Sequence, residues 1–283
     1  MNTLPLPENE LQRLNALQNY QILDTLIEGD YDRITELASL IWDVPISLVL
    51  LIDENRQWFK SKLGLDVAET PGELAFCQYA ILNNCIFKVE DATLNARFKE
   101  NILVTAEPNI RFYAGCPLID QNGFALGTLC IIDRKPKALT ESQKRALQLL
   151  AEEVTSLIVK KGQREELRNF ESLFELSNDL LFVGGIDGFF KKVNPAFEKA
   201  LGWEKEFLLS TTSLDFIHPD DVDCTFKELR KLSEGHNSVN FVQRFKSKSN
   251  GYRSIQWTSA PEPLTGNIFG IGREYYSTNN TRK

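Results

Sequence analysis

Apolar and β-branched positions near the middle of the chain predict two adjacent strands. The runs 110–119 and 124–132 flank the sequence Asp-Gln-Asn-Gly at 120–123. Asn-Gly favours a hairpin, because the favoured two-residue turn needs positive φ at both central residues. Gly115 and Gly127 remove side chains from the two strands, which indicates a bulge or the close approach of another group. The pattern therefore predicts a hairpin in the middle of an antiparallel sheet.

The residues before this hairpin show both helical and strand periods. Apolar residues at helical spacing predict helices at 4–24, 28–42 and 73–82. In the second of these helices, one face is formed by Ile34, Leu37, Ala38 and Ile41. Apolar runs predict strands at 47–52, 57–63 and 86–89, and then an irregular connection over one face of the sheet at 96–108. This order predicts an α+β domain, an antiparallel sheet with helices on one face.

A long helix is predicted after the hairpin. Thr140 and Gln143 have the spacing of a capping box at its start. The apolar residues that follow at the 3-4-3 spacing of a coiled coil are Leu147, Leu150, Val154 and Leu157. A polar stretch at 160–166 interrupts this pattern, which resumes in a new phase at Leu167, Phe170 and Phe174. The pattern favours a signalling helix that pairs with a second copy of the chain through residues 140–175. A surface helix followed by a linker is the alternative.

The last third of the chain has the pattern of a second mixed domain. Strands at 180–186 and 189–193 meet at Asp187-Gly188, a hairpin turn signal. Pro195 and Pro219 each occupy the first turn of a predicted helix, the first ending at Leu201 and the second near Leu232. Strands are then predicted at 239–246, 252–259 and 268–273.

Length, charge and cysteine content limit the class of protein. A chain of 283 residues is long enough for two domains. A net charge of −7 and a pI of 5.1 argue against binding to nucleic acid. No apolar run approaches the roughly 18 residues of a membrane helix, and the acidic N-terminus lacks the features of a signal peptide. Five cysteines without a CxxC motif fit a reducing compartment. We therefore expect a cytoplasmic protein without nucleic-acid or membrane partners.

Four segments resemble known families. RFYAGCPLIDQNGFALGTLCIID and PISLVLLIDENRQWFKS resemble the GAF family of sensory domains, whereas FELSNDLLFVGGIDGFFKKVNPAFEKALGW and FIHPDD resemble the PAS family. The resemblance implies a GAF-like sensory domain at 1–160, a helical linker at 161–171 and a PAS-like sensory domain at 172–283. Each would be an antiparallel sheet with helices, and a long helix would join them, as in the input region of bacterial sensor histidine kinases.

The cofactor signatures of these families are missing. The photoactive flavin site of PAS domains needs a cysteine in an Asn-Cys-Arg-Phe-like motif, and Cys224 lies inside a predicted helix instead. His218 is interpreted as a structural residue near a helix start rather than a haem ligand. The GAF-like half contains no histidine, so the residue that accompanies a bilin-binding cysteine is absent. We expect neither a covalent chromophore nor haem nor a metal site, and the identity of any cofactor stays unknown.

A ligand pocket is predicted between the first sheet and residues 75–103. Its lining would comprise the aromatic residues Phe76, Phe98, Phe112 and Tyr113. The alternative is that these side chains only fill a core, since most apolar side chains serve packing.

The resemblance implies a sensory module that relays a ligand or partner signal through the connecting helix to a histidine kinase or another effector. The chain has no kinase or cyclase catalytic motif, so we assign no catalytic residue. Two alternatives stay open. One GAF relative is a cysteine-dependent reductase of free methionine sulfoxide, and Cys77 and Cys85 lie roughly where two of its cysteines fall. The other alternative is a ligand-free dimerisation scaffold.

Overall fold

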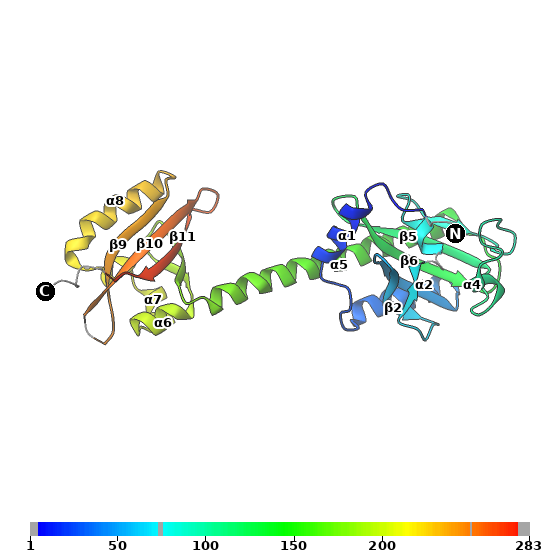
Figure 1. Ribbon diagram of the computed structural model, residues 1–283, viewed down its shortest axis with the longest axis horizontal. Helices are drawn as coiled ribbons and strands as arrows, with labels where there is room; N and C mark the ends of the chain where they lie inside the picture. Colours follow the sequence, from blue (N-terminus) through cyan, green and yellow to red (C-terminus); the bar gives the residue numbers. More distant parts are fainter. Residues whose placement is uncertain (1–4, 73–75, 250, 277–283) are drawn as a thin grey trace. The chain divides into compact units, whose positions relative to one another are not determined.

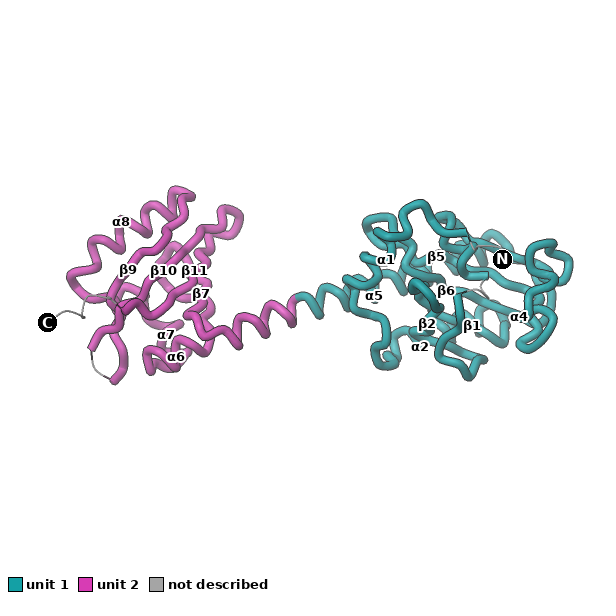
Figure 2. Tube along the Cα trace, in the orientation of Figure 1, with its two compact units in different colours: residues 1–166 teal, residues 167–283 magenta. Residues whose placement is uncertain are grey.

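The computed structural model describes residues 5–72, 76–249 and 251–276. The chain divides into two compact units, residues 1–166 and 167–283 (Figure 2). Each unit contains an antiparallel sheet and several helices, and the helix α5, Glu141–Leu176, contributes residues to both (Figure 1). This confirms the predicted α+β class with two domains and a long connecting helix.

The sheet of the first unit has the order β3-β2-β1-β6-β5-β4, with every neighbouring pair antiparallel. Its strands are β1 Ile46–Ile52, β2 Arg56–Leu63, β3 Glu69–Pro71, β4 Phe87–Val89, β5 Phe112–Ile119 and β6 Ala125–Asp133. The predicted hairpin is β5–β6. Strand β6 lies between β1 and β5, which confirms its central position.

The turn of this hairpin differs from the predicted one. Within it Gly123 has a positive φ of 85°, whereas Asn122 does not. The carboxylate of Asp120 accepts hydrogen bonds from the backbone N–H groups of Asn122 and Phe124, each at 2.9 Å. Because an aspartate can stabilise a wider turn in this way, the chain does not need the tight two-residue turn that Asn-Gly favours.

The two strand glycines permit close approaches. A Cβ atom at Gly127 would lie 2.0 Å from the carbonyl oxygen of Leu50 on β1, and one at Gly115 would lie 2.2 Å from the hydroxyl of Tyr113. Both distances are far below van der Waals contact. The structure thus confirms that another group approaches each glycine closely.

Three helices cover one face of this sheet: α1 Glu10–Asn19, α2 Gly29–Trp42 and the first part of α5. The other face is covered by the short helices α3 Phe76–Ala80 and α4 Ile102–Thr105 and by the connection between them. Both faces are therefore buried, and the irregular connection contributes one of the two cores. The first residues of the helix expected at 73–82 lie outside the described residues.

The buried face of α2 is rotated from the predicted one. Tyr31, Ile34, Ala38 and Trp42 are buried, whereas Leu37 is 48% exposed and Ile41 is 47% exposed. The two sets differ by about one position on a helix of 3.6 residues per turn. The sheet selects the face that carries the larger aromatic residues, a preference that aliphatic spacing alone does not reveal.

Helix α5 begins with the predicted capping box. The backbone N–H of Gln143 donates to Thr140 Oγ1 at 3.2 Å, and the backbone N–H of Thr140 donates to Gln143 Oε1 at 3.0 Å. The helix then continues without a break through the polar stretch 160–166.

The first half of α5 packs on its own sheet. Leu147, Val154 and Ile158 are fully buried in the core beneath α1 and α2, and Leu150 and Leu157 pack against this core. The prediction that this half forms a coiled-coil seam with a second copy is therefore wrong, because an intrachain sheet covers the stripe. In the second half, by contrast, Leu167 and Phe170 are 60% and 63% exposed.

The sheet of the second unit has the order β8-β7-β11-β10-β9. Its strands are β7 Leu180–Gly185, β8 Phe190–Val193, β9 Ser238–Lys246, β10 Tyr252–Glu262 and β11 Asn267–Glu274. Between β8 and β9 lie α6 Pro195–Leu201, α7 Lys205–Ser210, the 3₁₀ turns η2 Ser213–Phe216 and η3 Pro219–Asp221, and α8 Val222–Ser233. These elements match the predicted order, and an aromatic core around Phe197, Phe245 and Trp257 joins helices and sheet.

Candidate functional site

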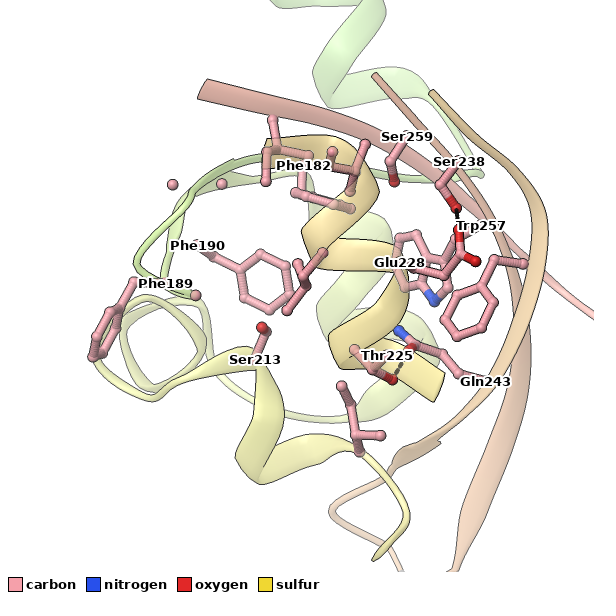
Figure 3. Close-up of a pocket in the computed structure, with 18 of the residues that line it drawn as sticks. Phe182, Phe189, Phe190, Ser213, Thr225, Glu228, Ser238, Gln243, Trp257 and Ser259 are labelled. Carbon is pink, nitrogen blue, oxygen red and sulfur yellow. Dashed lines mark hydrogen bonds between the residues drawn. The ribbon is translucent and has the colours of Figure 1, made fainter. Parts of the chain in front are cut away.

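The second unit has a cavity of about 80 Å³ between the inner face of its sheet and α8 (Figure 3). Aromatic side chains form much of its wall, among them Phe182, Phe190, Phe245 and Trp257. Gly270 and Gly272 on β11 make room for two of these rings: a Cβ atom would lie 2.0 Å from Phe182 or 2.5 Å from Trp257, respectively. The two glycines thus leave room on β11 for the rings of Phe182 and Trp257.

Two N–H donors line this cavity. Trp257 is 4% exposed, and its indole Nε1 has no hydrogen-bond partner within the described residues. Gln243 is 8% exposed and accepts a hydrogen bond from Thr225 Oγ1 at 2.9 Å, which leaves its amide NH₂ as a second donor (Figure 3). A buried donor without a partner costs about 1–3 kcal/mol. An acceptor oxygen inside the cavity would remove this cost.

A carboxylate also lines the cavity (Figure 3). Glu228 of α8 accepts a hydrogen bond from Ser238 Oγ at 2.7 Å and forms an ion pair with Lys231 at 2.6 Å. The hydrogen bond from Lys231 lowers the pKa of Glu228, the bond from Ser238 adds to this, and burial partly opposes both. The carboxylate is therefore ionised at neutral pH, so the cavity favours a neutral guest over an anion.

The first unit contains a larger cavity, of about 450 Å³, on the face covered by α3 and α4. Of the four residues expected to line a pocket in this unit, Phe76 and Tyr113 lie in the wall of this cavity. Phe98 stacks on Phe76 with ring centroids 4.1 Å apart and belongs to the same core. Phe112 lies in the core on the opposite face, because adjacent residues of a strand point to opposite sides. Of the four predicted residues, Phe76, Phe98 and Tyr113 therefore lie together in one core, whereas Phe112 lies in the other.

The reductase hypothesis relies on Cys77 and Cys85, but the structure places these two cysteines in different surroundings. Cys77 is buried and lines the 450 Å³ cavity, whereas Cys85 is exposed and lines a separate pocket with Lys88 and Lys144. Cys77 instead contacts Tyr113, whose hydroxyl donates to its Sγ at 3.2 Å, and Cys130. Sequence reasoning missed the proximity of Cys130 to Cys77. The pairing of Cys130 with Gly115 in the β5–β6 hairpin is the signal that could have found it.

His218 has a structural position. Its Nδ1 accepts a hydrogen bond from the backbone N–H of Asp220 at 3.2 Å, which caps η3, and its ring packs edge-on against Tyr252. In the part of the chain that the structure describes, no group of three or more His, Cys, Asp or Glu side chains could hold a metal ion.

Each α+β unit thus has a cavity beside its sheet. Residues 22–158 match the model of the GAF domain, and residues 190–268 match that of the PAS fold. The chain therefore carries a GAF domain followed by a PAS domain, as its sequence predicts. Among the helices of the described residues, none is both long and apolar enough to cross a membrane.

Similar proteins include a cyclic di-GMP phosphodiesterase of Pseudomonas aeruginosa, which is 42% identical over 137 residues, 48% of this chain and 23% of that protein. The White collar 1 protein of Neurospora crassa is 31% identical over 80 residues, 28% of this chain and 7% of that protein. The chain thus spans less than a quarter of either relative. A domain of a sensory box sensor histidine kinase/response regulator from Geobacter sulfurreducens superposes with a TM-score of 0.36 at 20% identity, covering 38% of this chain and 94% of that one.

Proposed function

We propose that this chain is the input part of a signalling protein, and that its PAS domain binds a small neutral molecule with an acceptor oxygen. The observation that carries this proposal is the unpartnered Trp257 N–H in the wall of the cavity. The amide of Gln243 adds a second donor, and the aromatic rings supply an apolar surround. A few convergent polar groups in an apolar pocket are typical of small-molecule sites.

A guest at Trp257 would act on the end of the connecting helix through β11. Trp257 on β10 pairs with Gly272, and the next residue, Arg273, binds Asp179 Oδ2 through Nε at 2.8 Å and Nη2 at 2.7 Å. Asp179 follows the last turn of α5, where the Asn194 amide donates to the carbonyl oxygens of Ser177 and Asp179. A change in the packing of Trp257 would thus alter the contacts that fix the helix end.

The second half of α5 is proposed to pair with a second copy of the chain. Leu167, Phe170, Leu173 and Leu176 are 60–80% exposed on this segment. Leu167, Phe170 and Phe174 have the 3-4 spacing that lets identical helices pack in parallel, because each residue then meets its own counterpart. Burial of each such side chain contributes roughly 1.5–3 kcal/mol before the cost of association. The homodimer predicted from 140–175 is thereby confined to its C-terminal part.

The effector is proposed to be a histidine kinase. The similarity of the GAF region to a cyclic di-GMP phosphodiesterase supports a second candidate, a domain that hydrolyses this nucleotide. The two are separated by assaying the protein isolated from its source cells, with all partners that copurify, for ATP-dependent autophosphorylation and for cyclic di-GMP hydrolysis. Activity in one assay that responds to removal of the cavity ligand identifies the output.

The ligand itself is tested through the indole N–H. Protein labelled with ¹⁵N in tryptophan is titrated with small neutral amides and ketones, and the Trp257 signal is assigned with Trp257→Phe. We expect the Trp257 Nε1–H signal to move, and Trp257→Phe to weaken binding about tenfold, the effect of one lost hydrogen bond. Trp42 serves as the internal control, because its buried Nε1 also has no partner among the described residues but lies in the GAF core. A purified protein without a bound small molecule in native mass spectra, with an unresponsive Trp257 signal, overturns the proposal.

A further inference from the structure

Four polar side chains meet inside the apolar core beneath α3. They are Cys77 on α3, Tyr113 on β5, and Thr128 and Cys130 on β6. Tyr113 OH donates to Cys77 Sγ at 3.2 Å, and Cys130, in the same buried cluster, lies close enough to Cys77 to affect its pKa. The Thr128 hydroxyl is buried and has no hydrogen-bond partner among the described residues. Burying polar groups in an apolar core costs free energy, because each group loses its hydrogen bonds to water. A cluster of four such groups is therefore a candidate for a functional role.

The backbone is shaped to bring these groups together. The ring of Tyr113 folds over Gly115, where a Cβ atom would lie 2.2 Å from its hydroxyl. Gly115 pairs with Cys130 across the β5–β6 ladder, so the Tyr113 hydroxyl is carried towards the two thiols. Any side chain at position 115 would displace it.

The two thiols differ in access. Cys77 is 5% exposed and lines the 450 Å³ cavity, whereas Cys130 is fully buried and does not line it. A small solute in the cavity therefore meets Cys77 first. Cys130 belongs to the same buried cluster as Cys77 but does not line the cavity, which suits a resolving cysteine.

The thiols also differ in acidity. Burial, the largest single effect, raises the pKa of the Cys77 thiol, but the hydrogen bonds from Cys130 and Tyr113 and the proximity of Thr128 together outweigh it, so that this pKa lies below its usual value. Burial raises the pKa of the Cys130 thiol well above its usual value, and the negative charge developing on Cys77 adds to this. The thiolate is the reactive form of cysteine, so reactivity concentrates on the thiol that faces the cavity.

We propose that Cys77 and Cys130 form a redox-sensitive pair that a small hydroperoxide entering the GAF cavity oxidises to a disulfide. The Cys77 thiolate attacks one peroxide oxygen, the O–O bond breaks, and an alcohol or water leaves with a proton while Cys77 becomes a sulfenic acid. The sulfur of Cys130 then attacks Cys77 Sγ, the S–S bond forms, and the sulfenic hydroxyl leaves as water with the proton of Cys130. The peroxide is reduced by two electrons, which the two thiols supply.

This inference goes beyond ligand binding by the PAS domain and does not depend on it. A disulfide has an S–S length of about 2.05 Å, so its formation draws α3 towards β6. Since Phe76 and Cys77 of α3 line the cavity, oxidation would change the shape of the GAF pocket and so its occupancy.

The test uses the full chain in a Cys85→Ser/Cys224→Ser background, which removes the two exposed thiols. After reduction and treatment with one equivalent of hydrogen peroxide, peptide mapping should find Cys77 linked to Cys130 and a mass lower by two hydrogen atoms. In Cys130→Ser, the Cys77 sulfenic acid should persist and react with dimedone. Tyr113→Phe should slow oxidation roughly threefold or more, because it removes a hydrogen bond to the thiolate.

Cys116 provides the matched control. It is a buried cysteine in the opposite core, and burial raises its pKa to about 12. Cys116→Ser should leave the rate and the product unchanged. The unsubstituted protein should show the same link between Cys77 and Cys130 in its peptide map. This measurement does not depend on whether a variant folds. A disulfide to Cys116, or a Cys77 that stays reduced in the folded protein while denatured protein reacts, overturns the inference.

Discussion

The ring of Tyr20 lies directly against Gly162 of α5, where a Cβ atom would come within 2.7 Å of Tyr20 Cδ1. The hydroxyl of the same tyrosine donates to Asp120 Oδ2 at 3.1 Å, and Asp120 fixes the turn of the central hairpin. Burial and the bond to Asp120 raise the pKa of Tyr20 to about 12. One side chain thus connects the hairpin turn to the connecting helix. The polar stretch around Gly162, which interrupts the apolar pattern of α5, is therefore a packing site.

We expect Gly162→Leu to destabilise the GAF domain by about 1–3 kcal/mol, because the added side chain overlaps the Tyr20 ring. Urea unfolding followed by circular dichroism measures the change. Gln163→Leu, one position on and exposed, should be near neutral. In a Tyr20→Ala background the penalty of Gly162→Leu should largely disappear. An equal penalty in both backgrounds would show that helix geometry, not Tyr20, requires the glycine.

The two halves of α5 should respond differently to a charge. Val154 is fully buried in the GAF core, so Val154→Glu should cost at least about 3 kcal/mol and reduce the folded fraction. Phe170 is 63% exposed, so Phe170→Glu should leave circular dichroism unchanged and convert dimer to monomer in light scattering. A wild type that is monomeric at tens of micromolar would contradict the dimer, whichever way Val154→Glu behaves.

Most of the fold could be predicted from the local sequence features of strands, turns and helix ends. Alternation, glycine positions and capping residues are local features, so the hairpin, the start of α5 and the PAS strands follow from the sequence. The buried face of α2 and the packing of α5 do not, because apolar stripes such as Leu147–Leu157 suit an intrachain sheet as well as a second helix. The packing of α5 becomes clear only from the assembled sheet, because the first half of this helix covers one of its apolar faces.

The site was harder to predict than the fold. Phe112 and Tyr113 are adjacent in sequence but belong to opposite cores, a separation that the strand period implies once the strand is known. The donors Trp257 and Gln243 lie on different strands, and no motif marks them. Their convergence results from sheet register, which depends on pairing far along the chain.

The bond between Arg273 and Asp179 should affect dynamics more than stability. Both side chains are partly solvated, and exposed ion pairs contribute about 0–1 kcal/mol. We expect Arg273→Gln to leave the unfolding free energy nearly unchanged but to speed amide exchange at 174–180, where α5 ends. Arg230→Gln, which removes an exposed ion pair with Glu234 at the end of α8, should not do so. If amide exchange at the helix end is unaltered, β11 does not transmit a change at Trp257 to the end of α5.

Glu28 joins two lysines from distant parts of the GAF domain. Its Oε1 lies 2.6 Å from Lys60 Nζ on β2 and 3.0 Å from Lys161 Nζ on α5. The Lys60 side chain is fully buried and also donates to Thr25 Oγ1 and the Leu26 carbonyl oxygen. Burial alone would raise the pKa of Glu28, but the hydrogen bonds from Lys60 and Lys161 outweigh it and hold the pKa below its usual value.

A carboxylate with a lowered pKa in the folded state adds stability above its unfolded pKa and loses it as the pH falls through the folded value. We therefore expect Glu28→Gln to be less stable than the wild type at pH 7 by about 1 kcal/mol, a modest figure because solvent screens the 38%-exposed carboxyl. This difference should shrink as the pH falls below about 4.5 and Glu28 is protonated. Urea unfolding of both proteins from pH 7 down to the acid limit of the folded state measures it, and Glu36→Gln, an exposed carboxyl of the same helix region, is the control. A difference that stays constant over this range would mean that the charge of Glu28 does not hold β2 and α5 together.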